Sequence, residues 1–340
     1  MQPRPSKSST LSLPSGNAIC YSGYRDGQNP GDKTYPSLAE IHEDLSILRK
    51  NWQLLRLYDC SPHAERVLQV IEQHELPFRV MLGAYLGPEM NNFGCPWGGT
   101  HTEEQLEASK QENEAELQRL ITLARRYPEI VFSVAVGNEA TVDWTDHFVP
   151  VPRMIDYVRR VKAALHQPVT FCENYVPWQY KLRDLVAELD FISLHTYPVW
   201  EYKHIHEALD YTRDNLASVA RLYPGKPIVI TEAGWCTNSN GRGMHAEHAV
   251  QELQAIYYQD LMDWTREAGL LCFVFEAFDE TWKGSPDPLE PEKHWGLFTV
   301  DRRPKLVMQA LYPDLMAPAV EALAIGRTAR GMPPDPGTRA

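Results

Sequence analysis

The sequence predicts a single (β/α)8 TIM barrel, and three observations carry this prediction. Apolar, β-branched segments alternate with segments of helical periodicity eight times along the chain, which indicates a parallel sheet with helical crossovers. The chain shows no repeat of the whole unit and no internal linker, so one closed barrel accounts for the alternation. The length of 340 residues fits as well, because such barrels commonly run to about 250 residues or more as one domain.

Each expected strand is a short apolar run between turn residues, and each expected helix places apolar residues three and four apart. The expected strands are 18–22, 53–58, 78–85, 130–136, 168–174, 190–197, 228–232 and 270–278. The expected helices are 35–51, 62–74, 102–127, 151–165, 181–188, 201–222, 244–267 and 304–311. We therefore expect one domain over 18–316, a flexible segment at 1–17 and a disordered, Pro- and Gly-rich tail at 317–340.

Composition excludes several classes of partner. The net charge of -12 argues against nucleic acid and against an anionic membrane surface, and it does not disfavour a neutral sugar. Residues 1–17 lack the apolar run of a secretory signal, and no stretch is long enough to span a membrane. The chain is therefore expected to be cytoplasmic or to lack its leader, the bacterial periplasm included, and to be a monomer. The six cysteines form no CxxC pair; we expect reduced thiols, with a Cys60–Cys95 disulfide as the open alternative.

Two segments place a carboxylate at the end of a buried strand. Val134–Ala140 runs from apolar residues into Gly-Asn-Glu, and Pro227–Trp235 runs into Thr-Glu-Ala-Gly-Trp. Parallel strands show their carboxyl ends to one face of a barrel, so Glu139 and Glu232 are expected to share that face. Two such carboxylates are the equipment of glycoside hydrolysis, whereas a single one is often only a helix cap.

Aromatic residues are expected to surround this face. Seven of the nine tryptophans follow a predicted strand: Trp97, Trp144, Trp178, Trp200, Trp235, Trp282 and Trp295. A pyranose ring has apolar C–H faces that stack on flat aromatics, so these loops predict an oligosaccharide groove. Packing within the loops would explain two or three of these tryptophans.

Polar residues of the last loops are expected near the two carboxylates. Glu280, Lys283 and Glu292 either bind sugar hydroxyls or form an ion-pair network that holds the loop. Tyr197 ends the sixth strand and is expected to donate to the nucleophile, while His195 is expected to be a polar residue of the rim. No nucleotide-binding motif occurs, so no cofactor is expected. His245 and His248 stand three apart on an expected helix without a third ligand at a familiar spacing, so no metal is expected either.

The chain resembles glycoside hydrolase family 17, the retaining β-1,3-glucanases and glucanosyltransferases, over roughly residues 19–311. The segments that carry the resemblance are Val136–Glu139, Thr231–Trp235, 275–283 with 292–298, and the first two strand ends, 21–27 and 56–59. The opening Tyr-Ser-Gly-Tyr-Arg-Asp-Gly-Gln is similar to the bacterial branch, in which transglycosylation and branching accompany hydrolysis.

The resemblance implies a β-glucan or gluco-oligosaccharide substrate and a sugar acceptor, with Glu232 as nucleophile and Glu139 as acid/base. Asn138 is expected to hold the sugar 2-hydroxyl. Further substrate contacts are expected from Tyr21, Arg25, Tyr58, Tyr197, Trp235, Glu280, Trp282, Lys283, Glu292 and Trp295. Transfer to sugar is expected to be slightly favoured over hydrolysis; a plain endo-β-1,3-glucanase and a non-catalytic carbohydrate-binding barrel are the alternatives.

Overall fold

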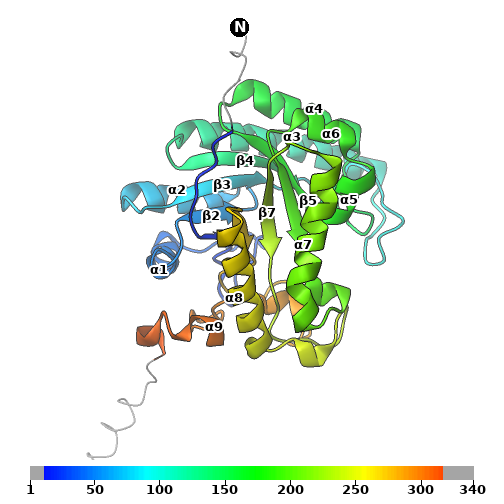
Figure 1. Cartoon of the computed structure of the whole chain (residues 1–340). Coiled ribbons are helices and arrows are strands. Elements are labelled where there is room, and N and C mark those ends of the chain that lie inside the picture. The colour runs from blue at the N-terminus through cyan, green and yellow to red at the C-terminus, as the bar shows by residue number, and fades with distance from the viewer. Residues whose placement is uncertain (1–10, 317–340) are drawn as a thin grey trace, which may run out of the picture.

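Eight parallel strands close into a barrel in the order of the sequence (Figure 1). The computed structural model describes residues 11–316, and β1 pairs with both β2 and β8 to close the ring. The strands are β1 Ala18–Cys20, β2 Leu54–Leu57, β3 Arg79–Ala84, β4 Val131–Asn138, β5 Val169–Asn174, β6 Ile192–Thr196, β7 Ile228–Ala233 and β8 Cys272–Val274. The predicted fold class is confirmed.

Helices connect the strands and cover the outside of the barrel (Figure 1). The α-helices are α1 Leu38–Leu48, α2 Pro62–Gln73, α3 Glu103–Arg126, α4 Val151–Ala164, α5 Tyr175–Tyr180, α6 Arg183–Glu188, α7 Ile205–Leu222, α8 Gln251–Glu267 and α9 Leu306–Gln309. Short 3₁₀ helices are η1 Pro198–Glu201, η2 Ala246–His248, η3 Pro291–Lys293 and η4 Pro313–Leu315. No helix within residues 11–316 is long and apolar enough to cross a membrane.

Local sequence explains where several helices begin. Ser37 caps α1 and Thr102 caps α3; in each case the residue three further on returns a hydrogen bond and completes a capping box. In α2 the buried residues fall three and four apart, as a helix lying on a barrel requires. Propensity and packing therefore agree in these helices.

Three expected regions differ from the structure. The expected helix 181–188 is α6, which begins at Arg183, and the helix before it, α5, was not expected; Asn174 caps α5 by accepting a hydrogen bond from the Val176 N–H at 3.0 Å. The expected helix 244–267 begins only at Gln251, because Val250 is extended after η2. The last strand covers three residues rather than nine, since the chain after Val274 leaves the sheet to build the site loop.

The inside of the barrel is polar where it faces the strand ends. Thr170 Oγ1 bonds Ser193 Oγ at 2.9 Å across β5 and β6, and Arg56 of β2 is buried. The six cysteines are free thiols; the Sγ atoms of Cys60 and Cys95 instead contact the carbonyls of Gly83 and Trp144. The alternative of a Cys60–Cys95 disulfide is therefore not realised.

The start of the described chain is packed against the barrel. Leu11 and Leu13 lie against the core, and the Asn17 side chain donates to the Asn51 carbonyl at 2.8 Å. Residues 11–17 therefore contact the barrel and the α1 side of the fold through Leu11, Leu13 and Asn17. Residues 1–10 and the tail expected at 317–340 lie outside the described range.

Candidate active site

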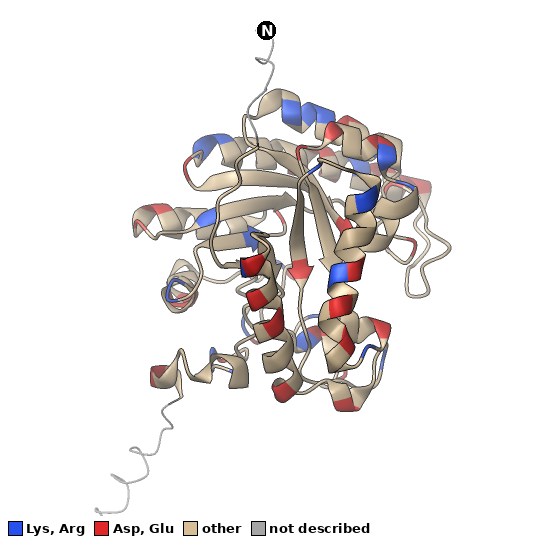
Figure 2. Ribbon diagram, in the orientation of Figure 1, with Lys and Arg blue, Asp and Glu red and all other residues tan. Residues whose placement is uncertain are grey.

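The two expected carboxylates come together at the carboxyl end of the barrel. Glu232 is the fifth residue of β7, whose end is marked red in Figure 2, and Glu139 follows the last residue of β4. One oxygen from each carboxylate and one ring nitrogen of His195 lie within 4.8 Å of one another. Retaining glycosidases hold their two carboxyl groups about 5–5.5 Å apart, and inverting enzymes leave at least about 6.5 Å for a water. The two carboxylates are therefore close enough to act on the same glycosidic bond.

A strained turn presents Glu139. Gly137 has φ of 91°, and a Cβ there would lie 3.0 Å from Met154 Cε, so the position requires glycine. Glu139 itself has φ of 45°, in the left-handed region that a non-glycine residue adopts at a cost of about 1–3 kcal/mol. The backbone is held there by the Glu139 N–H, which donates to the Cys172 carbonyl at 2.9 Å. Strain of this kind clusters at functional sites.

Three side chains hold Glu232 as an anion. Arg56 forms a buried ion pair with Oε1, Tyr58 donates to the same oxygen at 3.0 Å, and Tyr197 donates to Oε2. Burial raises the pKa of Glu232, but the charges of His195 and Arg56, with the hydrogen bonds, outweigh it and lower the pKa to about 2. The carboxylate of Glu232 is therefore ionised at neutral pH, as a nucleophile requires.

His195 bridges the two carboxylates. A register shift in the pairing of β6 with β7 sets His195 opposite Glu232. Its Nδ1 lies 2.9 Å from Glu139 Oε1 and 3.2 Å from Glu232 Oε2. Burial lowers the pKa of His195, but the charge of Glu232 and the hydrogen bond with Glu139 raise it to about 10. His195 thus lies near the end of β6 as a polar residue with a bonded Nδ1, but it is fully buried between the two carboxylates rather than exposed at the rim.

Glu280 and Lys283 form an ion-pair network of the last loop. Lys283 Nζ lies 2.8 Å from Glu276 Oε2 and pairs with Glu280 as well. Glu280 in turn accepts a hydrogen bond from Trp282 Nε1 at 3.0 Å and one from Ser22. Of the two readings left open for this loop, these contacts favour the one in which the charges hold the loop beside the site.

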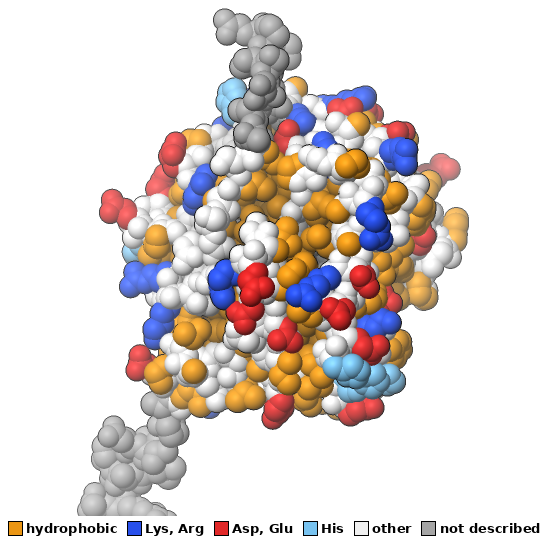
Figure 3. All heavy atoms as spheres, in the orientation of Figure 1, with side chains coloured by type: hydrophobic (Ala, Val, Ile, Leu, Met, Phe, Trp, Pro, Cys, Tyr) orange, Lys and Arg blue, Asp and Glu red, His pale blue; other side chains and the backbone are white. Residues whose placement is uncertain are grey.

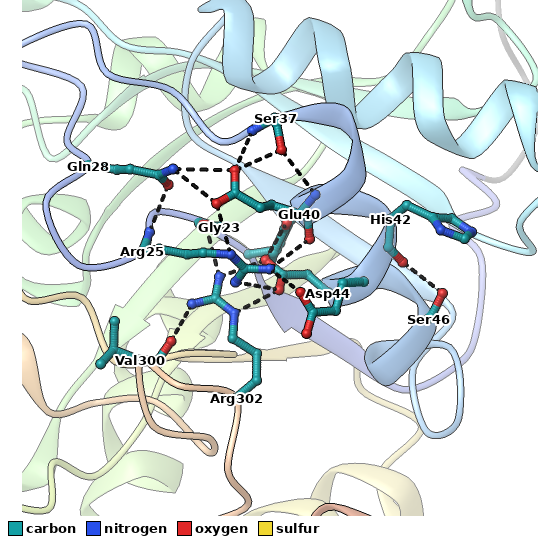
Figure 4. A network of polar contacts seen from close by, with 12 residues as sticks. Gly23, Arg25, Gln28, Ser37, Glu40, His42, Asp44, Ser46, Val300 and Arg302 are labelled. Carbon is teal, nitrogen blue, oxygen red and sulfur yellow. Dashed lines mark hydrogen bonds and ion pairs between the residues drawn. The ribbon is translucent and has the colours of Figure 1, made fainter.

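Three of the predicted substrate contacts are buried, and a fourth, Arg25, is half-buried and paired with carboxylates. Tyr21 is 1% exposed and donates to Asp44 at 3.0 Å. Arg25 pairs with Glu40, Glu43 and the same Asp44, which Arg302 also contacts (Figure 4). Both therefore join the first loop to α1. The indole of Trp235 is 1% exposed, and Trp295 is fully buried.

The buried tryptophans support other residues of the site. Trp235 donates from Nε1 to the His248 carbonyl at 2.8 Å, which fastens the loop after β7. The ring of Trp295 lies 5.0 Å from the ring of Tyr197, between centroids, and so supports the tyrosine that bonds Glu232. These residues are supports rather than platforms, because Trp235 packs on Tyr257 of α8 and Trp295 packs among Tyr197, Trp200 and Phe275.

Only part of the predicted set of tryptophans is exposed. Trp97 is 61% and Trp282 36% exposed, and Trp144 and Trp200 are half-buried. Trp178, Trp235 and Trp295 are buried. Four of the seven tryptophans therefore remain accessible for stacking.

The remaining predicted substrate-binding residues lie near the two carboxylates, Glu139 and Glu232. Tyr58 and Tyr197 bond Glu232 directly, and Asn138 Oδ1 accepts a hydrogen bond from Arg56. Glu292 lies on η3, half-exposed, with Arg242 Nη2 3.9 Å away. Asn138 and Glu292 therefore remain accessible to a ligand.

Sequence reasoning missed Arg56 and Phe275. Arg56 is a charged residue inside the apolar strand Leu54–Leu57, and a strand arginine at that place was an available signal of a buried partner. Phe275 follows β8, its ring centroid lies 5.6 Å from that of Tyr197, and Lys283 sits over the ring. No periodicity distinguishes Phe275 from a core residue.

The chemistry of the donor set favours acid/base and nucleophilic work over metal binding. Glu139, His195 and Glu232 are close enough to share an ion. The guanidinium of Arg56 and two phenol groups already occupy the oxygens of Glu232. A cation entering there would meet a fixed positive charge at contact distance.

Comparison with known proteins places this site in a family. Residues 18–296 match the model of the BtgE/BtgC glycoside hydrolase domain. A glucan 1,3-beta-glucosidase of Arthroderma benhamiae is 20% identical over 83% of this chain and 88% of its own. A glucan 1,3-beta-glucosidase of Schizosaccharomyces pombe is 23% identical over 78% and 79%.

Solved structures share the barrel. An endo-laminarinase from Formosa Hel1_33_131 superposes with a TM-score of 0.77 at 30% identity, over 88% of this chain and 87% of its own. A Rhizomucor miehei beta-1,3-glucanosyltransferase, solved as an active-site mutant with laminaritriose, superposes with a TM-score of 0.68 at 21% identity, over 86% and 96%.

Proposed function

The chain belongs to the BtgE/BtgC glycoside hydrolases of glycoside hydrolase family 17 and acts on β-1,3-glucan; from this premise we propose that it works by double displacement with retention, and that it transfers glucosyl units to a sugar slightly in preference to water. The observation that carries the mechanism is the close carboxylate pair, in which the pKa of Glu232 is lowered to about 2. Glu232 is the nucleophile and Glu139 the acid/base.

In the first step Glu232 attacks the anomeric carbon and Glu139 protonates the departing glycosidic oxygen. A covalent glycosyl-enzyme forms on Glu232, and the shortened glucan leaves. Arg56, Tyr58 and Tyr197 hold the attacking carboxylate in place, so little reorientation is needed at the moment of reaction. Asn138 lies beside Glu139 and is proposed to bind the 2-hydroxyl.

In the second step Glu139 takes a proton from the incoming hydroxyl, which attacks the glycosyl-enzyme and frees Glu232. A sugar hydroxyl or water serves as acceptor. Exposed Trp97 and Trp282 support the preference for sugar, because a stacked acceptor raises the local concentration of a hydroxyl. The burial of three other tryptophans reduces the number of stacking positions and keeps the proposed preference slight.

The test is a time course on one purified laminari-oligosaccharide at millimolar concentration. Products longer than the input that precede free glucose support transfer, and shorter products alone identify a plain endo-β-1,3-glucanase. Proton NMR of the first product checks the mechanism separately: a β-anomer is expected, and an α-anomer would refute retention whichever acceptor is used.

A further inference from the structure

Four histidines form a patch on the surface beside the carboxyl end of the barrel, seen as the pale-blue cluster in Figure 3. The patch consists of His204, His206, His245 and His248, whose neighbouring ring centroids lie 4.6 to 6.0 Å apart. His204 and His206 lie at the start of α7, which follows the loop after β6, and His245 and His248 lie in the loop between β7 and α8. Neither loop's histidines take part in the proposed chemistry.

A 3₁₀ turn brings two of them onto one face. His245 precedes η2 and His248 ends it, and the His248 N–H donates to the His245 carbonyl at 3.0 Å. Residues three apart eclipse one another in a 3₁₀ helix. The two rings accordingly lie 5.1 Å apart between centroids. On the α-helix expected from the sequence they would be splayed by a further 60° or so.

The third member comes from the other loop. His204 is the N-cap residue of α7, and its ring centroid lies 4.6 Å from that of His248 and 6.0 Å from that of His245. Two imidazoles on one tetrahedral ion, with metal–nitrogen distances of about 2.0–2.1 Å, have centroids roughly 5 Å apart. The trio therefore has the ring spacing of a three-histidine site.

The rings of His245 and His248 are free to turn toward an ion, and His204 lies at the N-terminal cap of α7. His204 and His245 are exposed and His248 is half-buried. Among residues 11–316, no hydrogen bond uses a ring nitrogen of His245 or His248. The nitrogens of the trio do not all lie within 4.8 Å of one another as they stand, so binding requires a side-chain rotation. Such rotations of exposed rings take nanoseconds or less.

We propose that His204, His245 and His248 bind a divalent transition ion of the zinc class, with water as the fourth ligand. Neutral imidazole suits zinc, copper and nickel, whereas magnesium and calcium prefer oxygen ligands. The carboxylates of Glu207 and Glu247, next to the trio in sequence, add negative charge around it.

The ion joins the two loops that flank Glu232. The loop after β6 carries Tyr197 and Trp200, and the loop after β7 packs Gly243 on Trp200 so closely that a Cβ would lie 2.5 Å from the indole. Arg242 also lies over that indole, 5.2 Å from its centroid. An ion held from both loops therefore stabilises their contact and leaves the reaction itself to the carboxylates.

The experiment is calorimetric titration of the full chain with ZnCl₂ at pH 7.5, with thermal unfolding followed in parallel. One zinc per chain and a rise in Tm of a few degrees are expected, and MgCl₂ should produce neither. The double variant His204→Ala/His248→Ala should weaken binding at least about 100-fold, more than loss of an outer-shell partner does. His42→Ala is the matched control: its ring stacks on that of His74 at 3.9 Å on another face, and zinc binding should be unchanged.

A second variant distinguishes the patch from the barrel centre, where Glu139, His195 and Glu232 also lie within reach of one ion. Glu139→Gln/Glu232→Gln should retain zinc binding. Loss of binding in that variant with retention in the histidine variant would place the ion in the barrel and overturn the proposal. Absence of saturable binding in the unaltered protein would overturn it as well.

Discussion

The hydrogen bond from Tyr197 to Glu232 is open to a clean test by Tyr197→Phe. The substitution removes one hydroxyl and keeps the ring, whose contacts with Phe275 and Trp295 have centroid distances of 5.6 and 5.0 Å. Because Tyr197 favours the charged form of Glu232, its loss should raise the pKa of that carboxyl above its value of about 2.

The size of the shift follows from the type of bond. A hydrogen bond to a charged group contributes about 1.5–3 kcal/mol, and one pKa unit corresponds to about 1.36 kcal/mol. The pKa of Glu232 should therefore rise by about 1–2 units. The acid limb of kcat/KM, which reports the free nucleophile, should move to higher pH by the same amount.

The free energy of unfolding should also depend on pH in the direction that the lowered pKa of Glu232 requires. A carboxyl whose pKa is lowered on folding adds stability above its ordinary value of 4.5, and this stability is lost as pH falls toward about 2. Tyr197→Phe should cost about 1.5–3 kcal/mol at pH 7. The difference from the unaltered protein should shrink across the window from 4.5 to 2.

The assay is a pH profile of kcat/KM on laminari-oligosaccharides, joined to urea unfolding at several pH values. Tyr257→Phe is the control, because the Tyr257 hydroxyl is also buried and lies 2.8 Å from Thr212 Oγ1, away from the pair. The control should lose stability of about 0.5–1.5 kcal/mol and keep the original acid limb. An acid limb of Tyr197→Phe that stays in place or moves to lower pH would refute the reasoning.

Three further predictions concern the roles and the buried charges. Glu232→Ala with azide should yield the α-glycosyl azide from an activated β-glucoside, and Glu139→Ala the β-azide; NMR that gives the reverse would exchange the two roles. His195→Gln should lower the free energy of unfolding most below pH 6.5, and this loss of stability should disappear as pH rises through about 10. If urea titrations show a loss of stability that grows with pH, the prediction is contradicted. Lys283→Met leaves Glu276 buried without its partner at 2.8 Å. The substitution should lower the free energy of unfolding by about 3–5 kcal/mol, and a loss below about 1 kcal/mol in urea unfolding would show that the pair is unimportant for stability.

The barrel and the carboxylate pair were predictable from sequence because both follow from local patterns. Eight apolar runs with helices between them leave few topologies, since crossovers between parallel strands are right-handed and adjacent. Once the strands are parallel, Glu139 and Glu232 must emerge at the same end. Their exact spacing also depends on the left-handed turn at Gly137 and Glu139, which the strand pattern does not reveal.

The surroundings of the pair were less predictable because they depend on contacts between distant segments. Trp235 and Trp295 follow strands as a sugar platform would, yet both are buried against other aromatic rings. Arg25 is 277 positions from Arg302 in the sequence, and both bind Asp44. A one-dimensional pattern does not contain such partners, so exposure could not be read from position alone.

The histidine patch also depends on a contact between distant segments that the sequence does not reveal. The sequence shows His245 and His248 three apart, and a helix there has no third ligand at a familiar spacing. The third ring belongs to His204, 41 positions earlier than His245. It becomes a neighbour only because β6 and β7 are adjacent in the barrel, so the loops after these strands meet.

The buried charges also explain how one site serves two opposite steps. Before the reaction the proposed mechanism has one negative charge on Glu232, with Arg56 and His195 as cations. After attack Glu232 is an ester and Glu139, having given up its proton, carries the negative charge, so the net charge of the site is the same. His195 Nδ1 lies 2.9 Å from Glu139 and 3.2 Å from Glu232. The N–H on Nδ1 therefore faces both carboxylates and pairs with whichever of them carries the charge, so neither anion is left unpaired in the barrel.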